Sequence, residues 1–249
     1  MQVVNHWGWA WPAGCAALGL AAGAVANYCI LRLPWDEAEG PFATACVGCG
    51  RAYGLVAHLP ILGVAYRRCR WCRWSRPGWR PGVELGNAAL WALLALTDDP
   101  WTTAAMLRML LVTSLLVLAV IDLQHFVLPD VITLPGIVAG IAATLLPGWP
   151  VSLVDAALSA SIGYFAMMAL ATAAESYYGE EALGQGDWKL VAMLGALLGA
   201  SKLLIVLLIA NVTGAAVGLL LVAKYGQDGR RKLPLGTFLG AAGILMVFA

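Results

Sequence analysis

Long runs of apolar residues alternate along the chain with short polar stretches. A bilayer core requires about 20 apolar residues per helix. Runs of this kind predict transmembrane helices near 12–31, 83–97, 103–121, 131–147, 152–173, 188–201, 202–223 and 234–249. The stretch 188–223 fits either two helices broken near Ser201-Lys202 or one long kinked helix. We therefore predict an all-α polytopic integral membrane protein with about eight transmembrane helices, seven being the competing count.

The composition agrees with a membrane protein and excludes other classes. Of the 249 residues, 61% are hydrophobic and only 12% are charged. A soluble domain of this size needs far more charge to cover its surface. The formal net charge of +1 argues against a nucleic-acid-binding protein, which should be strongly basic. The expected partner is therefore the lipid bilayer, with no nucleic acid.

Basic residues gather on one side of the predicted membrane. The flank 1–11 holds no Lys or Arg, so it lacks the basic region of a signal peptide and should lie outside the cell. Eight alternating spans then place the loops 32–82, 122–130, 174–187 and 224–232 in the cytoplasm. Counting Lys189 at a loop edge, 13 of the 15 basic residues lie on that side. This bias sets the predicted orientation, because basic loops stay in the cytoplasm.

The segment 32–82 carries four cysteines in two C-x-x-C pairs. Cys46 and Cys49 form the first pair, and Cys69 and Cys72 form the second, 19 residues further on. This spacing is typical of a four-thiolate zinc site, which would be structural because it leaves no position open for water. Disulfides would not persist in the reducing cytoplasm. An iron–sulfur or rubredoxin-type iron site uses the same ligands and stays open as an alternative.

Two carboxylates lie at the ends of predicted spans. A charge inside a span costs about 2.5–3.5 kcal/mol or more, so function is the default explanation for it. Asp122 ends an apolar run, where the helix macrodipole disfavours an anion. Asp130 follows Pro129 and is predicted to be the N-cap of the next helix, which is a sufficient structural role. Asp122 has no such explanation and becomes a candidate catalytic residue.

The second candidate is Asp187, which follows Gly184-Gln185-Gly186 on the same predicted face. The alternative is a purely structural role for Asp187, as the N-cap of the next helix. Gly184 and Gly186 would let an extended substrate backbone approach closely, so we predict that they bind substrate. Two aspartates that meet at a membrane edge should share one proton, so that one activates water while the other donates to the peptide carbonyl.

A proton- or cation-coupled transporter with a cytoplasmic metal domain is the rival function. It predicts carboxylates near the bilayer midplane and internal symmetry. The sequence shows neither, because both aspartates fall at span ends and no repeat is visible.

With these residues identified, the chain resembles the type IV prepilin peptidases, the bacterial leader peptidase/N-methyltransferase family. Five stretches carry the resemblance in the same order as in the family. They are 27–34 at the end of the first helix, the C-x-x-C pairs with Arg80-Pro-Gly-Val-Glu84 after them, Asp122 to Asp130 ending in Leu-Pro-Asp, the GxGD block 179–189, and Lys232-Leu-Pro-Leu-Gly236. The last of these resembles the family stretch Ile/Leu-Pro-Phe-Gly-Pro.

The resemblance implies an eight-helix aspartyl endopeptidase of the bacterial inner membrane. It would cut the basic leader of type IV prepilins or type II secretion pseudopilins on the cytoplasmic side, after a glycine. Asp122 and Asp187 would be the catalytic pair, and Cys46, Cys49, Cys69 and Cys72 would bind zinc. Many members also methylate the new N-terminus with S-adenosylmethionine as donor. The implied regions are a first helix (1–31), a zinc-binding domain (32–82) and a peptidase domain (83–249).

The chain departs from the family pattern in the zinc segment. It has Phe42-Ala-Thr-Ala-Cys46 where the family usually has Gly-Arg-Ser before the first pair. Between the pairs it has Ala57-His-Leu-Pro60, where the family usually has a polar residue before Ile-Pro. These changes put methylation in doubt more than proteolysis.

Overall fold

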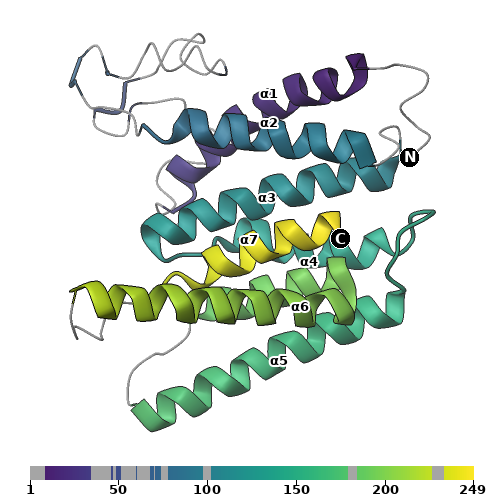
Figure 1. The fold of residues 1–249 in the computed structure, drawn as a ribbon, viewed down its shortest axis with the longest axis vertical. Coiled ribbons are helices and arrows are strands. Elements are labelled where there is room, and N and C mark those ends of the chain that lie inside the picture. The colour runs from purple at the N-terminus through teal and green to yellow at the C-terminus, as the bar shows by residue number, and fades with distance from the viewer. Residues whose placement is uncertain are drawn as a thin grey trace. The chain divides into compact units, whose positions relative to one another are not determined.

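The computed structural model describes residues 9–34, 46, 49–51, 60, 68–69, 71–73, 78–97, 102–178, 184–225 and 233–249. Most of the predicted zinc segment 32–82, residues 179–183 of the GxGD block and Lys232 therefore lie outside the described residues. The described part of the chain forms seven helices (Figure 1): α1 (Ala10–Arg32), α2 (Arg80–Thr97), α3 (Thr103–His125), α4 (Asp130–Ala143), α5 (Leu153–Tyr178), α6 (Gln185–Tyr225) and α7 (Leu235–Phe248). The chain divides into two compact units, Met1–Thr113 and Ser114–Ala249.

In the first unit, two glycines on one face of α1 allow α2 to pack at close range. A Cβ atom on Gly19 would lie 2.9 Å from the Ala88 Cα, and a Cβ atom on Gly23 would lie 2.7 Å from the Glu84 Cα. Small residues four positions apart are the usual means by which membrane helices approach each other.

Buried polar side chains reinforce this helix pair. The Asn27 amide, which is fully buried, donates to the Glu84 Oε1 atom over 2.9 Å and to the Arg80 carbonyl over 2.9 Å. The buried Asn87 amide donates to the Gly19 carbonyl over 2.8 Å. A buried polar group costs free energy unless it is paired, so these hydrogen bonds fix how α1 and α2 pack together.

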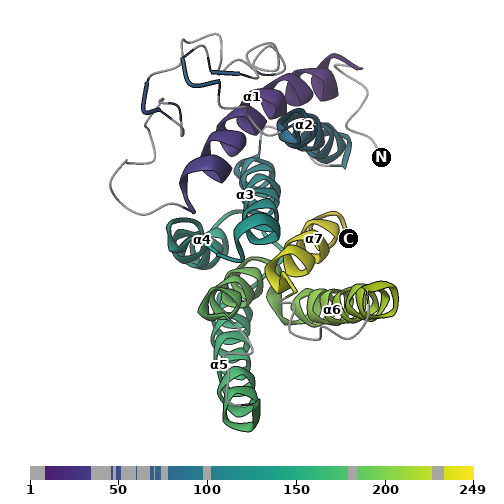
Figure 2. The ribbon, with the colours of Figure 1, turned by 90° about the vertical axis from the view of Figure 1, so that its left-hand side faces the viewer.

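The second unit is built around the first half of α6. Its residues 190–198 are all buried, and α6 packs against α4, α5 and α7 (Figure 2). Ala192 and Ala196 on α6 meet Ala160 on α5, with Ile137 and Tyr164 packed against this small-residue contact. Small side chains on facing helices allow close packing without a gap.

Helix α6 is interrupted at Gly199, whose backbone has φ 76° and ψ 172°. Left-handed φ values are accessible to glycine without the penalty that a Cβ atom brings. The Asp155 carboxylate on α5 accepts a hydrogen bond from the Ala200 N–H over 3.1 Å and thereby caps the second part of α6. The interruption lies two residues before Ser201, where the sequence analysis expects either a break or a kink.

Among the described residues, four helices are long and apolar enough to cross a membrane: Ala10–Arg32, Thr103–His125, Leu153–Tyr177 and Gln185–Lys224. Helices α4 and α7 are also apolar but have 14 residues each, which is shorter than the ~20 residues of a typical span. The count of eight spans therefore remains a prediction.

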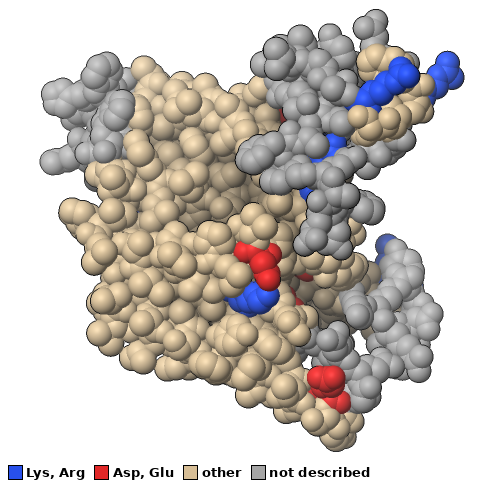
Figure 3. All heavy atoms as spheres, turned by 180° about the vertical axis from the view of Figure 1, so that it is seen from behind, with Lys and Arg blue, Asp and Glu red and all other residues tan. Residues whose placement is uncertain are grey.

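Few of the described side chains on the face shown in Figure 3 are charged. Large apolar side chains are exposed along α5 and the second half of α6, among them Leu158, Ile162 and Phe165 on α5 and Leu204, Leu208 and Leu219 on α6. Contiguous apolar surface on this scale is unfavourable in water and favourable in lipid. The exposed faces therefore agree with a protein embedded in a membrane.

Candidate active site

Asp122 lies near the C-terminal end of α3 and is buried, with 5% of its surface exposed. Just beyond the helix, Phe126 adopts φ 55°, and its N–H bonds to the Asp122 carbonyl over 2.9 Å. The left-handed residue turns the chain out of the helix. Asp122 is therefore held on ordered helix, one turn before the chain changes direction.

The N-terminus of α7 meets the Asp122 side chain. The Thr237 N–H donates to Oδ2 of Asp122 over 2.6 Å, and the Thr237 hydroxyl lies 3.1 Å from the same atom. Thr237 is not among the residues predicted from the sequence. Its signal is weak, because a threonine in the first turn of a helix is common and its partner lies 115 positions away.

Asp187 lies in the first turn of α6 and is half-buried. The helix begins at Gln185, and the Asp187 N–H bonds to the Gly184 carbonyl over 3.1 Å. Gly184 therefore occupies the N-cap position, and the alternative explanation of Asp187 as an N-cap is wrong. The charges of the Asp187 and Asp122 carboxylates are close enough to interact. The second unit thus brings together the two aspartates that the sequence analysis singled out.

Leu128 packs between the start of α6, which carries Asp187, and the start of α7, which contacts Asp122. A Cβ atom on Gly186 would lie 2.7 Å from the Leu128 Cβ, and a Cβ atom on Gly236 would lie 2.9 Å from the Leu128 Cδ1. Gly186 precedes Asp187, and Gly236 lies against Asp122. Leu128, itself 8% exposed, therefore acts as a spacer between the α6 and α7 ends of the site.

The two predicted substrate-binding glycines differ in their surroundings. At Gly186 the close approach is made by the protein's own Leu128. Gly184 is exposed, and a Cβ atom there would meet only the Asp187 Oδ2 atom, at 3.7 Å. Substrate binding at either glycine remains a prediction.

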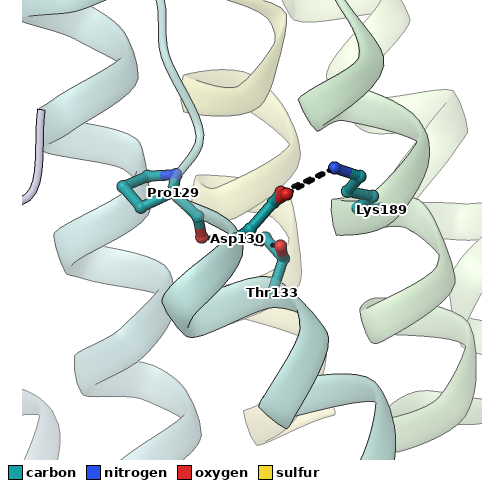
Figure 4. A network of polar contacts seen from close by, with 4 residues as sticks. All are labelled: Pro129, Asp130, Thr133 and Lys189. Atoms are coloured by element: carbon teal, nitrogen blue, oxygen red, sulfur yellow. Dashed lines mark hydrogen bonds and ion pairs between the residues drawn. The ribbon is translucent and has the colours of Figure 1, made fainter. Parts of the chain in front are cut away.

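Asp130 is not the N-cap that the sequence analysis expects. Pro129 occupies the N-cap position of α4 with an extended backbone, and Asp130 is the first helical residue. Its carboxylate instead forms an ion pair with Lys189, whose Nζ lies 2.7 Å from both carboxylate oxygens (Figure 4). The N-cap prediction failed because Lys189 comes from another helix, α6. Its ammonium group offers the Asp130 carboxylate a stronger, charge-assisted hydrogen bond than the backbone N–H groups at the start of α4 do.

The four predicted metal ligands converge in the first unit. The Cys46, Cys49, Cys69 and Cys72 sulfur atoms all lie within 4.8 Å of one another. The Cys46–Cys72 distance is 3.6 Å and the Cys49–Cys69 distance is 3.7 Å. Tetrahedral zinc with bonds of about 2.3 Å requires sulfurs about 3.8 Å apart, so this arrangement fits the ion. A disulfide bond would need about 2.05 Å.

Backbone turns shape both cysteine pairs. The Gly50 N–H bonds to the Cys46 carbonyl over 2.8 Å, and the Arg73 N–H bonds to the Cys69 carbonyl over 3.1 Å. Hydrogen bonds from the Cys72 and Trp71 backbone to the Cys69 sulfur lower the pKa of this thiol. A thiolate is the form that binds metal, so the turns favour the ligand state of the cysteine.

Two family models match the chain. Residues 109–219 match the type IV leader peptidase family, and residues 17–97 match the bacterial peptidase A24 N-terminal domain. Both aspartates lie in the first match and all four cysteines lie in the second.

Curated relatives named prepilin leader peptidase/N-methyltransferase align with most of the chain. The protein from Myxococcus xanthus is 37% identical over 216 residues, covering 86% of this chain and 64% of its own length. The one from Aeromonas hydrophila is 37% identical over 203 residues, covering 80% and 69%. The one from Burkholderia pseudomallei strain K96243 is 37% identical over 258 residues, covering 93% and 83%. The chain thus spans slightly less than two thirds of the Myxococcus protein. No solved structure matches.

Proposed function

The chain belongs to the type IV leader peptidase family, and we propose that it is a membrane aspartyl endopeptidase that removes the leader of type IV prepilins or pseudopilins. One observation supports this most strongly: Asp122 from the end of α3 and Asp187 from the start of α6 lie close enough for their charges to interact. The family membership gives the transporter alternative no support.

The proposed chemistry uses one ionised and one protonated carboxyl group. The ionised aspartate takes a proton from a water molecule as the water oxygen attacks the scissile carbonyl carbon. The protonated aspartate gives its proton to the carbonyl oxygen. When the tetrahedral intermediate collapses, the C–N bond breaks, one aspartate gives its proton to the leaving nitrogen, and the other takes a proton from a hydroxyl of the intermediate as the C=O bond re-forms. The pair then again holds one proton. Two carboxyl groups near each other hold one proton between them, as this cycle requires.

We further propose that the chain crosses a bacterial inner membrane eight times, with the aspartates on the cytoplasmic side. The break at Gly199 supports this count, because a helix of 41 residues is about twice as long as one span requires. The excess of basic residues in alternate loops supports the orientation. A reporter fused after Tyr225 should then lie on the same side as one inserted before Gly184. Reporters on opposite sides would contradict the paired crossing of α6.

The cysteine cluster would hold a structural zinc ion, which would supply folding energy to the segment around it and take no part in peptide cleavage. Methylation of the new N-terminus with S-adenosylmethionine is proposed on the names of the relatives. No residue of this chain is assigned to that second reaction.

Processing of a co-expressed prepilin, in cells that lack their own peptidase, tests the proposed function. The wild type should cleave the leader, and Asp122→Ala or Asp187→Ala should abolish cleavage while the protein still reaches the membrane. Asp155→Asn is a matched control, since it also removes one carboxylate from the second unit but lies at the α6 break. Cleavage by either alanine variant at the wild-type rate would refute the aspartyl mechanism.

A further inference from the structure

Asp122 sits between two helix ends of opposite polarity. It lies in the last turn of α3, where carbonyl groups make an anion unfavourable. The first turn of α7 opposes this effect, because its free N–H groups and the positive end of its dipole face the carboxylate. The contact with α7 therefore offsets the unfavourable effect of the C-terminal end of α3 on the ionised Asp122 carboxylate.

Two features hold α7 in the place this contact requires. Gly236 has no side chain, and a Cβ atom there would lie 3.0 Å from the Asp122 Cγ, so only glycine lets the first turn come so close. At the other end of the helix, the Lys202 Nζ donates to the Met246 carbonyl over 3.2 Å. An anion at the N-terminus and a cation at the C-terminus are both favourable to the helix dipole.

The Thr237 hydroxyl has two acceptors but a single proton. Its oxygen lies 3.1 Å from Oδ2 of Asp122 and 3.0 Å from the Ala119 carbonyl. A hydroxyl can donate only one hydrogen bond at a time, while its lone pairs can also accept one.

We propose that Thr237 is a positioning residue for Asp122, and that its hydroxyl proton alternates between Asp122 and the Ala119 carbonyl during turnover. When Asp122 is ionised, the hydroxyl donates to Oδ2. When Asp122 carries a proton on Oδ2, that proton is donated to the hydroxyl oxygen, and the hydroxyl donates to Ala119. No proton is gained or lost by Thr237, and Asp122 keeps one orientation in both states. This inference rests on the proposed function.

Thr237→Val removes the hydroxyl, keeps the shape and leaves the backbone N–H in place. Thr237→Ser keeps both donors. The matched control is Thr213→Val, because within the described part of the chain the Thr213 hydroxyl bonds only to carbonyls of its own helix, Ile209 and Ala210. The experiment measures kcat and KM for a prepilin substrate with the full-length protein in lipid vesicles, together with its melting temperature.

We expect Thr237→Val to lower kcat about tenfold or more, the usual worth of a hydrogen bond to a charged group, with KM within about twofold of the wild type. Thr237→Ser should restore kcat to within about threefold, and Thr213→Val should match the wild type. A wild-type kcat in Thr237→Val would overturn the inference. A loss of kcat in Thr237→Val that unfolding explains entirely would also overturn the inference. An equal loss of kcat in Thr237→Ser would overturn it as well. If the wild type itself cleaves nothing, the proposed function fails instead.

Discussion

At the scale of single residues, the site depends on contacts between side chains and glycines that lie far apart in the sequence. Leu128 meets Gly186 on one side and Gly236 on the other. Each glycine adjoins one of the aspartates, either in the chain or in space. The size of one leucine side chain therefore helps to set the separation of the two carboxylates, and closely packed contacts of this kind tolerate little added volume.

Alanine substitutions of the two glycines before Asp187 should have different effects. Gly186→Ala places a methyl group against Leu128, which must displace the first turn of α6, so we expect a large loss of kcat and a lower melting temperature. A Cβ atom at Gly184 would make only an ordinary van der Waals contact with the Asp187 Oδ2 atom, at 3.7 Å, so Gly184→Ala should fold normally. If Gly184 also binds substrate, its variant should raise KM alone. Equal behaviour of the two variants in a cleavage and thermal-unfolding assay would contradict the spacer role of Leu128.

The ion pair between Asp130 and Lys189 should contribute modestly to stability. Half of the Asp130 side chain is exposed, and exposed ion pairs contribute about 0–1 kcal/mol. Asp130→Asn should therefore keep prepilin cleavage within a few-fold of the wild type. Asp130→Lys should be worse, because it places two cations together, and adding Lys189→Asp should recover both cleavage and melting temperature.

A folded but inactive Asp130→Asn variant, with an active Asp122→Asn variant, would reverse the assignment of these two aspartates. Failure of the charge swap to recover the melting temperature would show that the ion pair does not join α4 and α6 as described.

At the scale of helices, the break in α6 is stabilised by a side chain from α5. The Asp155 Oδ1 atom accepts from the Ala200 N–H and from the Ser159 hydroxyl, which lies 2.9 Å away. This is N-capping by a residue of another helix, and it satisfies a backbone donor that the interruption at Gly199 leaves without a partner in its own helix.

Asp155→Ala should lower the free energy of unfolding by about 1 kcal/mol, the usual contribution of a helix cap. Asp155→Asn should retain most of it, because an amide oxygen can accept the same hydrogen bonds. Thermal unfolding of the purified protein in detergent measures both. Equal destabilisation by Ala and Asn would indicate that the charge of Asp155, rather than the cap, is what matters.

The sequence predicts helices well but not their tertiary partners. Apolar runs predict the ends of the helices to within a few residues. Asp122 and Asp187 stand out because a carboxylate beside an apolar run is energetically unfavourable, so a functional role is the default explanation. The break is harder to locate, since α6 contains five glycines and only Gly199 has Asp155 against it. Thr237 and Lys189 could not be assigned, because their partners are 115 and 59 positions away.

At the scale of the whole molecule, the cysteine cluster and the aspartate pair lie in different compact units. The cysteines belong to Met1–Thr113, and both aspartates belong to Ser114–Ala249. The two family models divide the chain at a similar place, with one match ending at residue 97 and the other beginning at 109. Metal binding and peptide cleavage should therefore be separable by mutation.

Purified protein should contain about one zinc ion per chain, and Cys69→Ser should lose it because three thiolates bind the ion less tightly than four. Elemental analysis measures this directly. Protease resistance of the segment around the cysteines should fall after chelation. Iron with a visible absorption band would contradict the zinc assignment and favour the alternative iron site.

The central claim is that the Asp122 and Asp187 carboxyl groups together hydrolyse the leader peptide bond. Mass spectrometry of a prepilin incubated with the protein in vesicles tests it most directly, comparing the wild type with Asp122→Asn and Asp187→Asn. Each variant has nearly the same shape but cannot take part in proton transfer. We predict a cleaved leader with the wild type and only intact prepilin with either variant. Cleavage at the same bond by either asparagine variant, at a rate near the wild type, would contradict the account.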